Sequence, residues 1–311
     1  MNKKKVLLQH HSIYTKLVCM KVVIFGNTYK KDNLALLSTL FEVLTRKKAQ
    51  IGIEKAFFEF VSQYIVVSPK VDVFCAEDVF MADLAVSIGG DGTFLKTAYC
   101  VGNKGIPVIG INTGRLGFLA DIAHDDIVGP LEKILNNEFL IEERTVLEMK
   151  CGTQCKVNCR NVALNEIAIL KQDSSSMITI DAYINDKHLI SYEADGLIVA
   201  TPTGSTAYSM SVGGPLVIPN AKNIILTPVA SHSLTVRPLV LTDDSIIRVE
   251  VKSRTNSFLA SVDGRSEVFN HTNTLHIKKA NYTIKVVKQQ DHDFFNTLRN
   301  KLLWGVDKRI H

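Results

Sequence analysis

The hydrophobic positions of this chain follow one period in its first half and another in its second. Over residues 21–137, short apolar runs such as 84–88 and 108–111 alternate with stretches in which apolar residues recur every three or four positions. Short apolar runs predict buried strands, and the longer spacing predicts amphipathic helices. This alternation indicates an α/β fold with a parallel sheet. The predicted helices cover residues 32–44, 57–64, 93–101 and 126–137.

The second half of the chain follows a period of two residues. Apolar and polar residues alternate over 178–184, and the same alternation recurs over 247–251 and 282–286. Such alternation predicts half-buried strands. Asn185-Asp186 and Asp263-Gly264 are turn signals between these strands. The second half therefore predicts a mainly antiparallel, sandwich-like all-β domain.

The length of 311 residues indicates two domains, at roughly 100 to 200 residues per domain. We expect an α/β domain with a Rossmann-like parallel sheet over residues 20–122 and the β domain over 123–290. Apolar residues at helical spacing predict a C-terminal helix, within 291–311, that packs on the first domain. Residues 1–19 lack the cleavage site of a signal peptide. Because Met20 directly precedes the first predicted strand, we expect the natural chain to begin there and residues 1–19 to be an extension.

Composition and charge exclude several classes of protein. Hydrophobic residues make up 46% and charged residues 22%, which is typical of a globular protein. The longest apolar runs fall far below the ~20 residues of a membrane span. The net charge of +5 comes from basic residues spread along the chain, so nucleic-acid binding has no support. A mildly basic balance suits small anionic ligands, but many other proteins share it.

The six cysteines form no CxxC pair. Reduced thiols in the cytoplasm are the simplest interpretation. Cys151, Cys155 and Cys159 are spaced like metal ligands but lack a matched fourth ligand, so we assign no metal site to protein side chains.

A glycine-rich loop lies between an apolar strand and a helix. It contains Gly89, Gly90 and Gly92, with Asp91 in the middle and Thr93 after it. Glycines let a phosphate or a ribose approach the backbone, and the N-terminus of the following helix favours an anion. Asp91 is well placed to accept a proton from a hydroxyl group in phosphoryl transfer. The alternative is an ordinary glycine turn with Asp91 as the helix cap. Neither a GxxxxGK[ST] loop nor a GxGxxG motif after a strand is present.

Two further groups of polar residues lie among apolar strands. Seven of the eleven residues in 201–211 carry hydroxyl groups, which can bind phosphates, adenine or ribose without burying a charge. A polar linker is the alternative, but the bordering strands argue against it. Asn165 and Glu166 interrupt an apolar strand, and burying Glu166 requires a partner. That partner is a ligand hydroxyl or a basic side chain.

Gly89–Gly92, Asn165-Glu166 and Thr201–Ser209, in this order, closely resemble the signature motifs of the bacterial NAD kinase family. The resemblance covers nearly the whole chain and includes residues 21–26, 112–119, 237–239 and 295–298 with Trp304. The glycine-aspartate motif alone is shared with diacylglycerol and sphingosine kinases and with phosphofructokinases. The hydroxyl-rich segment is the specific element.

This resemblance implies that NAD is phosphorylated on the 2′-hydroxyl of its adenosine ribose to give NADP. The phosphate donor is ATP or a related compound, used with a divalent metal cation, Mg²⁺ being the expected one. The active site is implied to lie between the two domains and across subunits of a homodimer or homotetramer. Asp91 matches the proton acceptor, and Asn165 and Glu166 match the pair that contacts the ribose. The other matching NAD-binding positions are Gly92, Lys96, Asp195, Thr206, Ala207, Tyr208, Ser209, Met210, Ser211, Ala230 and Arg265.

Some alternatives stay open at this point. Several relatives carry Gln at the position of Arg265, so Arg265 could instead pair with a phosphate. A lipid kinase would need an apolar groove and no Asn165-Glu166 pair. A nucleotide sensor without catalysis is a third possibility, although the presence of Asp91 argues against it.

Overall fold

The computed structural model describes residues 19–28, 34–67, 70–114, 117–123, 127–152, 161–173, 176–290 and 293–303. Residues 1–18 of the expected extension lie outside the described residues. The same holds for Asp32 and Asp126 at two predicted helix starts, for Cys155 and Cys159, and for Trp304. Of the described cysteines, those at positions 19, 75 and 100 are free thiols.

The first half forms the predicted parallel sheet. Its strands lie in the order β3-β2-β1-β4-β5, and neighbouring strands run parallel. Successive residues of a strand point to opposite faces. Val22 therefore packs against the helices α1 (Leu34–Arg46) and α4 (Val128–Leu135), whereas Val23 packs with Phe94 of the helix α3 (Asp91–Val101). The strands are β1 (Lys21–Gly26), β2 (Gln50–Glu54), β3 (Asp72–Phe74), β4 (Leu84–Gly89), β5 (Val108–Asn112) and β6 (Ile122–Ala123).

The helices follow the predicted apolar spacing with shifted ends. The helix α3 begins at Asp91, two residues before its predicted start, and α2 ends at Val61, before Tyr64. The helices of this half are α1 (Leu34–Arg46), α2 (Lys55–Val61), α3 (Asp91–Val101) and α4 (Val128–Leu135), with a short 3₁₀ helix η2 (Gly102–Lys104).

The second half is mainly antiparallel, as predicted. Its two layers enclose one core, to which Ile180, Leu197 and Phe258 contribute. One layer has the strand order β14-β13-β12-β9-β16-β17. These strands are β9 (Glu166–Lys171), β12 (Gly196–Ala200), β13 (Asn223–Val229), β14 (Leu239–Thr242), β16 (Ser257–Val262) and β17 (Arg265–Asn270). The other layer contains β7 (Leu140–Cys151), β8 (Val162–Ala163), β10 (Ile178–Ile184), β11 (Lys187–Ala194), β15 (Ile247–Lys252) and β18 (Leu275–Lys288).

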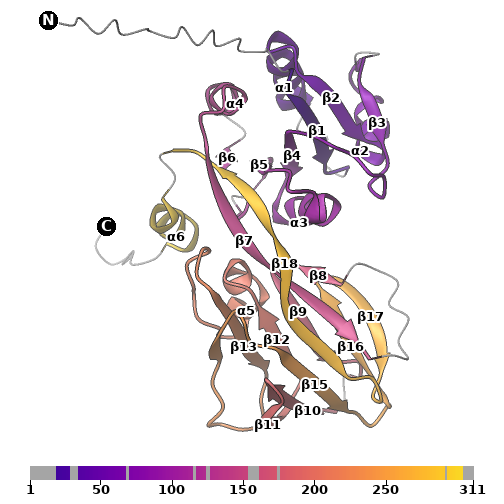
Figure 1. Ribbon diagram of the computed structural model, residues 1–311, viewed down its shortest axis with the longest axis vertical. Coiled ribbons are helices and arrows are strands. Elements are labelled where there is room, and N and C mark those ends of the chain that lie inside the picture. The colour runs from indigo at the N-terminus through magenta and orange to yellow at the C-terminus, as the bar shows by residue number, and fades with distance from the viewer. Residues whose placement is uncertain are drawn as a thin grey trace, which may run out of the picture.

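Two long strands connect the halves of the molecule. Figure 1 shows β7 and β18 running side by side from the second half to the sheet of the first. Near its end β18 lies parallel to β5, with Val286 opposite Val108. In the described part of the chain, the parallel sheet and one layer of the β half are therefore a single twelve-stranded sheet. The boundary expected between residues 122 and 123 stays a prediction.

After β18 the chain forms the helix α6 (Phe294–Leu302), whose first turn is capped by the Asp293 side chain. The ammonium group of Lys301 lies 4.8 Å from the centre of the Phe118 ring, so the predicted C-terminal helix contacts the loop that precedes β6. No helix in the described residues has the length and apolarity that crossing a membrane requires.

Candidate active site

The glycine-rich loop opens onto a cavity of about 420 Å³ at the carboxyl ends of β1 and β4. A Cβ atom built at Gly90 or Gly92 would meet no described atom within 4 Å. Internal packing therefore does not explain these two glycines, and their open side leaves the backbone accessible to a ligand. Lys96 lines the same cavity, and its ammonium group lies 3.4 Å from the buried carboxylate of Glu54.

Asp91 is held by the loop that follows β5. Its Oδ2 atom accepts a hydrogen bond of 2.8 Å from the backbone N–H of Phe118, and its Oδ1 atom one of 3.0 Å from that of Leu119. A Cβ atom at Gly117 would lie 2.0 Å from Oδ1, so this contact requires glycine. Asp91 is not the helix cap, because Gly90 is the N-cap of α3.

Asn165 lies in a break between two strands and Glu166 begins the second of them, β9, so the pair is not inside one strand as the sequence predicted. The cause is Asp263, in the turn between β16 and β17. Its carboxylate accepts hydrogen bonds from the backbone N–H groups of Leu164, Asn165 and Glu166, at 2.7, 2.9 and 3.1 Å. These N–H groups cannot also pair with a neighbouring strand. Sequence analysis identified Asp263 only as a turn residue, and its role here has no local signal.

This break leaves two buried acceptors unpartnered. Asn165 Oδ1 and Glu166 Oε2 find no hydrogen-bond partner among the described residues. Burial, together with the charge of Asp263, raises the pKa of Glu166 to about 7, although a hydrogen bond from the backbone of Tyr208 acts to lower it. Buried acceptors without partners are rare in folded proteins and are expected where a ligand donates hydrogen bonds.

The hydroxyl-rich segment wraps around this break. The Thr201 N–H donates to the Asn165 carbonyl at 2.8 Å, and the Thr201 hydroxyl donates to the Leu164 carbonyl at 2.6 Å. A Cβ atom at Gly204 would lie 2.1 Å from the Asn165 carbonyl oxygen, so only glycine allows the approach. The segment forms a 3₁₀ helix η3 (Thr203–Thr206) and a short helix α5 (Tyr208–Ser211).

Most hydroxyl groups of this segment bind within the protein. Ser205 bonds with the backbone of Val217, and Ser209 bonds with Thr227. Thr201, Thr203 and Thr206 are also engaged internally. The side chains of Tyr208 and Ser211 are exposed, whereas Ala207 and Met210 are half-buried. The hydroxyls mainly fix the shape of the segment.

Buried charged groups connect this segment to the Asp91 loop. Arg144 of β7 donates to the Thr203 hydroxyl at 3.3 Å and pairs with Glu142 at 2.5 Å. Lys288 at the end of β18 forms a buried ion pair with Asp121, which follows the residues that hold Asp91. None of these four charged residues was predicted from the sequence, because each lies far along the chain from the motif it supports.

Two predicted site residues lie elsewhere. The Asp195 N–H donates to the carbonyl of Val229, the residue before Ala230, so Asp195 and Ala230 both lie beside the start of β12. Glu166 pairs with Ala200 at the other end of that strand. The five residues of β12 span on the order of 15 Å. Within one chain, the length of β12 therefore separates Asp195 from the Asn165-Glu166 break. The Asp195 carboxylate pairs instead with Lys171 at 2.7 Å.

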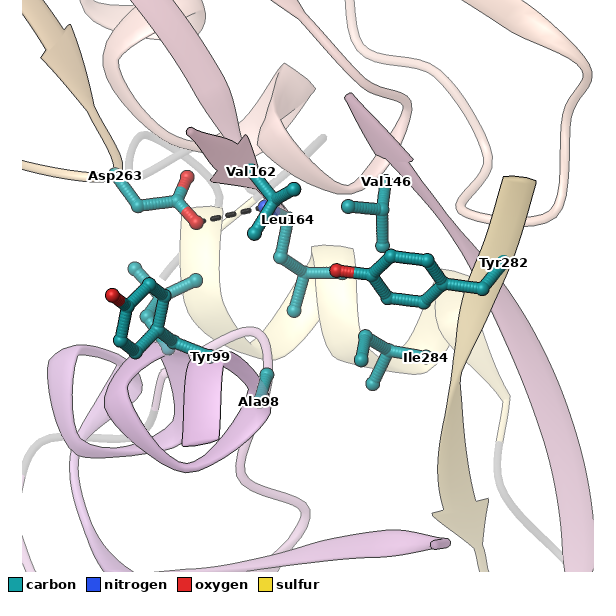
Figure 2. A pocket seen from close by; sticks show the side chains of 9 residues that line it. Ala98, Tyr99, Val146, Val162, Leu164, Asp263, Tyr282 and Ile284 are labelled. Atoms are coloured by element: carbon teal, nitrogen blue, oxygen red, sulfur yellow. Dashed lines mark hydrogen bonds between the residues drawn. The ribbon is translucent and has the colours of Figure 1, made fainter. Parts of the chain in front are cut away.

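Arg265 joins the two halves of the molecule. Its guanidinium group donates to the Val162 carbonyl at 2.8 Å and lies 4.4 Å from the centre of the Tyr99 ring of α3. Figure 2 shows the adjoining cavity, where Asp263 points to the backbone of Leu164 and Tyr99 approaches from α3. This cavity of about 10 Å³ has room for about one water molecule, so the halves are closely packed there.

Comparisons with known proteins identify the family of this chain. Residues 22–139 match the family model of the ATP-NAD kinase N-terminal domain, and residues 164–289 match that of the C-terminal domain. The NAD kinase of Bacteroides fragilis is 51% identical over 291 residues, covering 94% of this chain and all of the relative. The NAD kinase of Flavobacterium psychrophilum is 40% identical over 293 residues, covering 93% of this chain and all of the relative.

Solved structures have the same fold. Yeast NADH kinase complexed with NADH superposes with a TM-score of 0.84 at 25% identity, covering 94% of this chain and 90% of that one. An NAD kinase from Archaeoglobus fulgidus in complex with ATP superposes with a TM-score of 0.70 at 24% identity, covering 91% and 99%. Matches to both domain models and to relatives over nearly the full length establish that this chain belongs to the ATP-NAD kinase family.

Proposed function

We propose that this protein transfers a phosphoryl group from ATP to the 2′-hydroxyl of the adenosine ribose of NAD, giving NADP. The observation that carries this proposal is the pair of buried, unpartnered acceptors, Asn165 Oδ1 and Glu166 Oε2. Ribose hydroxyl groups are donors that satisfy both. The pKa of Glu166 is about 7, and a hydrogen bond donated by a ribose hydroxyl would stabilise its ionised form.

Asp91 accepts the proton of the attacking hydroxyl. A carboxylate offers about four lone-pair sites, and the N–H groups of Phe118 and Leu119 occupy two of them. The remaining sites can accept the hydroxyl proton while the two N–H groups keep the carboxylate oriented. The ribose oxygen forms a bond to the γ-phosphorus as the bond to the bridging oxygen breaks, and ADP leaves with that electron pair.

The cavity beside Gly90 and Gly92 receives the phosphates of the donor. Its open glycine backbone and the ammonium group of Lys96 suit an anion. Among the described residues, no group of three or more His, Cys, Asp or Glu side chains could hold a metal ion. A divalent cation such as Mg²⁺ would therefore enter on the donor phosphates, where it would neutralise their charge.

Asp195 and Ala230 contact NAD bound to a second copy of the chain, in a homodimer or homotetramer. Their place at the far end of β12 from Glu166 supports this assignment, since one NAD contacting both places would have to extend along the whole strand. The free thiols of Cys19, Cys75 and Cys100 support a cytoplasmic location, where thiols stay reduced.

An assay of the purified protein tests this function. The protein is incubated with Mg²⁺, ATP and NAD, and the product is identified by ³¹P NMR and by a dehydrogenase that requires NADP. We expect NADP with its phosphate on the 2′-oxygen. Parallel reactions with diacylglycerol test the lipid kinase alternative, and reactions with NADH or polyphosphate define the substrates. Binding of NAD without any NADP formed would contradict the proposal and favour a nucleotide sensor.

A further inference from the structure

Lys301, near the end of α6, lies close to the residues that hold Asp91. Its ammonium group lies 4.8 Å from the centre of the Phe118 ring, and the N–H of the same Phe118 donates to Asp91 Oδ2. The side chain is half-buried. A lysine that is 210 residues away in sequence from Asp91 therefore reaches the same loop.

The charged groups around this loop are unequally paired. Lys288 forms an ion pair with Asp121, and Arg144 forms one with Glu142. Lys301 forms no ion pair among the residues that the structure describes, although the charges of Asp121 and Asp91 act to raise its pKa. A half-buried ammonium group without a counter-ion is unfavourable, and an anionic ligand would compensate it.

Phosphoryl transfer supplies such an anion at this position. The transferred group carries negative charge and must approach the carboxylate of Asp91, which repels it. A cation beside that carboxylate offsets the repulsion, as cations do in phosphoryl transfer generally. The two cations Lys288 and Arg144 are already paired, so Lys301 is the candidate whose charge is uncommitted.

We propose that Lys301 binds the non-bridging oxygens of the phosphoryl group that is transferred beside Asp91, and thus the 2′-phosphate of the product. The C-terminal helix then completes the active site and does not serve only as a structural brace. This inference rests on the proposed function, because it assumes that the phosphoryl group arrives at Asp91.

Binding and turnover of Lys301→Met test the role of the charge. Equilibrium affinities for NAD and NADP are measured by calorimetry, together with kcat. We expect NADP binding and kcat to fall by about 10- to 100-fold, as for loss of a hydrogen bond to a charged group, with NAD affinity within about twofold. Lys301→Arg should retain most of both. Arg299→Met removes a charge from the exposed face of the same helix and should change neither.

Equal weakening of NAD and NADP, or no change in either, would overturn the proposal and leave Lys301 as a packing residue. NADP formation by the unaltered protein is the separate test of the proposed function. Should Lys301→Met fail to fold, proton uptake by the unaltered protein still tests the proposal.

Burial lowers the pKa of Lys301 to about 8. The charge of Lys288 also lowers it, whereas the charges of Asp121 and Asp91 raise it. A bound phosphate would raise it again.

NADP binding at a pH of about 8.5 should therefore take up protons that NAD binding does not. The uptake is measured by calorimetry in two buffers of different ionisation enthalpy. Lys301→Arg, whose guanidinium group stays charged, should abolish the difference. Equal proton uptake for the two nucleotides would contradict a contact between Lys301 and the 2′-phosphate.

Discussion

At position 166 a carboxyl group is held where its charge is unfavourable. Burial, with the neighbouring Asp263, raises the pKa of Glu166 from 4.5 to about 7. Between these values the native protein binds a proton that the unfolded chain has lost, so the free energy of unfolding falls as the pH rises through this window. The buried charge therefore destabilises the ligand-free protein at higher pH, and a hydrogen bond from a ligand hydroxyl can offset this cost.

Glu166→Gln should remove that part of the pH dependence. Since a neutral amide avoids the buried charge, we expect the variant to gain on the order of 3 kcal/mol of unfolding free energy at pH 8 and little at pH 4.5. Urea unfolding at the two pH values measures this. Glu59→Gln, on the exposed face of α2, should keep the pH dependence of the original protein. An unchanged slope between pH 4.5 and 7 in Glu166→Gln would contradict the assigned pKa.

Gly117 shows how close the Asp91 loop packs. A Cβ atom there would lie 2.0 Å from Asp91 Oδ1, so Gly117→Ala must displace the carboxylate or the loop. A displacement of about 1 Å can cost on the order of 100-fold in rate, and we expect kcat to fall by that amount with NAD affinity little changed. Gly152→Ala, whose Cβ would meet its nearest atom at 4.0 Å, is the control and should be active. Full activity of Gly117→Ala would show that the position of Asp91 is not critical.

At the scale of elements, the hairpin β16–β17 shapes the site. Asp263 at its turn accepts hydrogen bonds from three backbone N–H groups at the break in the chain between β8 and β9. The sequence predicted the turn itself, as a turn between strands. It could not predict the break, because Asp263 lies about 100 residues from Leu164 and local patterns carry no information on such contacts.

Asp263→Asn should lower both stability and NAD affinity. An amide offers one oxygen and turns N–H groups toward backbone donors, so at least one buried N–H loses its partner, at a cost of about 1 to 3 kcal/mol. Thermal unfolding and NAD titration measure the two effects. Asp186→Asn, at the other turn predicted from sequence, is the matched control because that side chain is 91% exposed. Equal stability of the two variants would contradict the role given to Asp263.

At the scale of the whole molecule, the proposed site takes residues from both halves. The core that contains Phe94 of α3 also contains Leu164 and Ile284 of the β half, and β18 extends the parallel sheet through Val286. Periodicity predicted the α/β half and the antiparallel half, and the motifs predicted Asp91, Asn165 and Glu166. The sequence also predicted that a C-terminal helix packs on the first half, and Lys301 of α6 contacts Phe118 there. The joining by Arg265 and by β18 could not be predicted, since it depends on contacts between segments distant in sequence.

The residues that connect the Asp91 loop to the hydroxyl-rich segment were missed for the same reason. Lys288 and Arg144 lie on long strands whose residue pattern indicates only half-buried positions. Both are buried because each pairs with a carboxylate: Arg144 with Glu142 on the same strand, and Lys288 with Asp121 from a distant part of the sequence. The burial of these two charged residues could therefore not be predicted without knowing their partners.

The most direct test of the account is the turnover of Asp91→Asn, measured together with its affinity for NAD. An asparagine cannot accept the ribose proton, so kcat should fall by about 10²- to 10⁴-fold, whereas the dissociation constant of NAD should change by no more than about threefold. Near-normal formation of NADP by this variant would contradict the central claim that Asp91 accepts the proton of the 2′-hydroxyl.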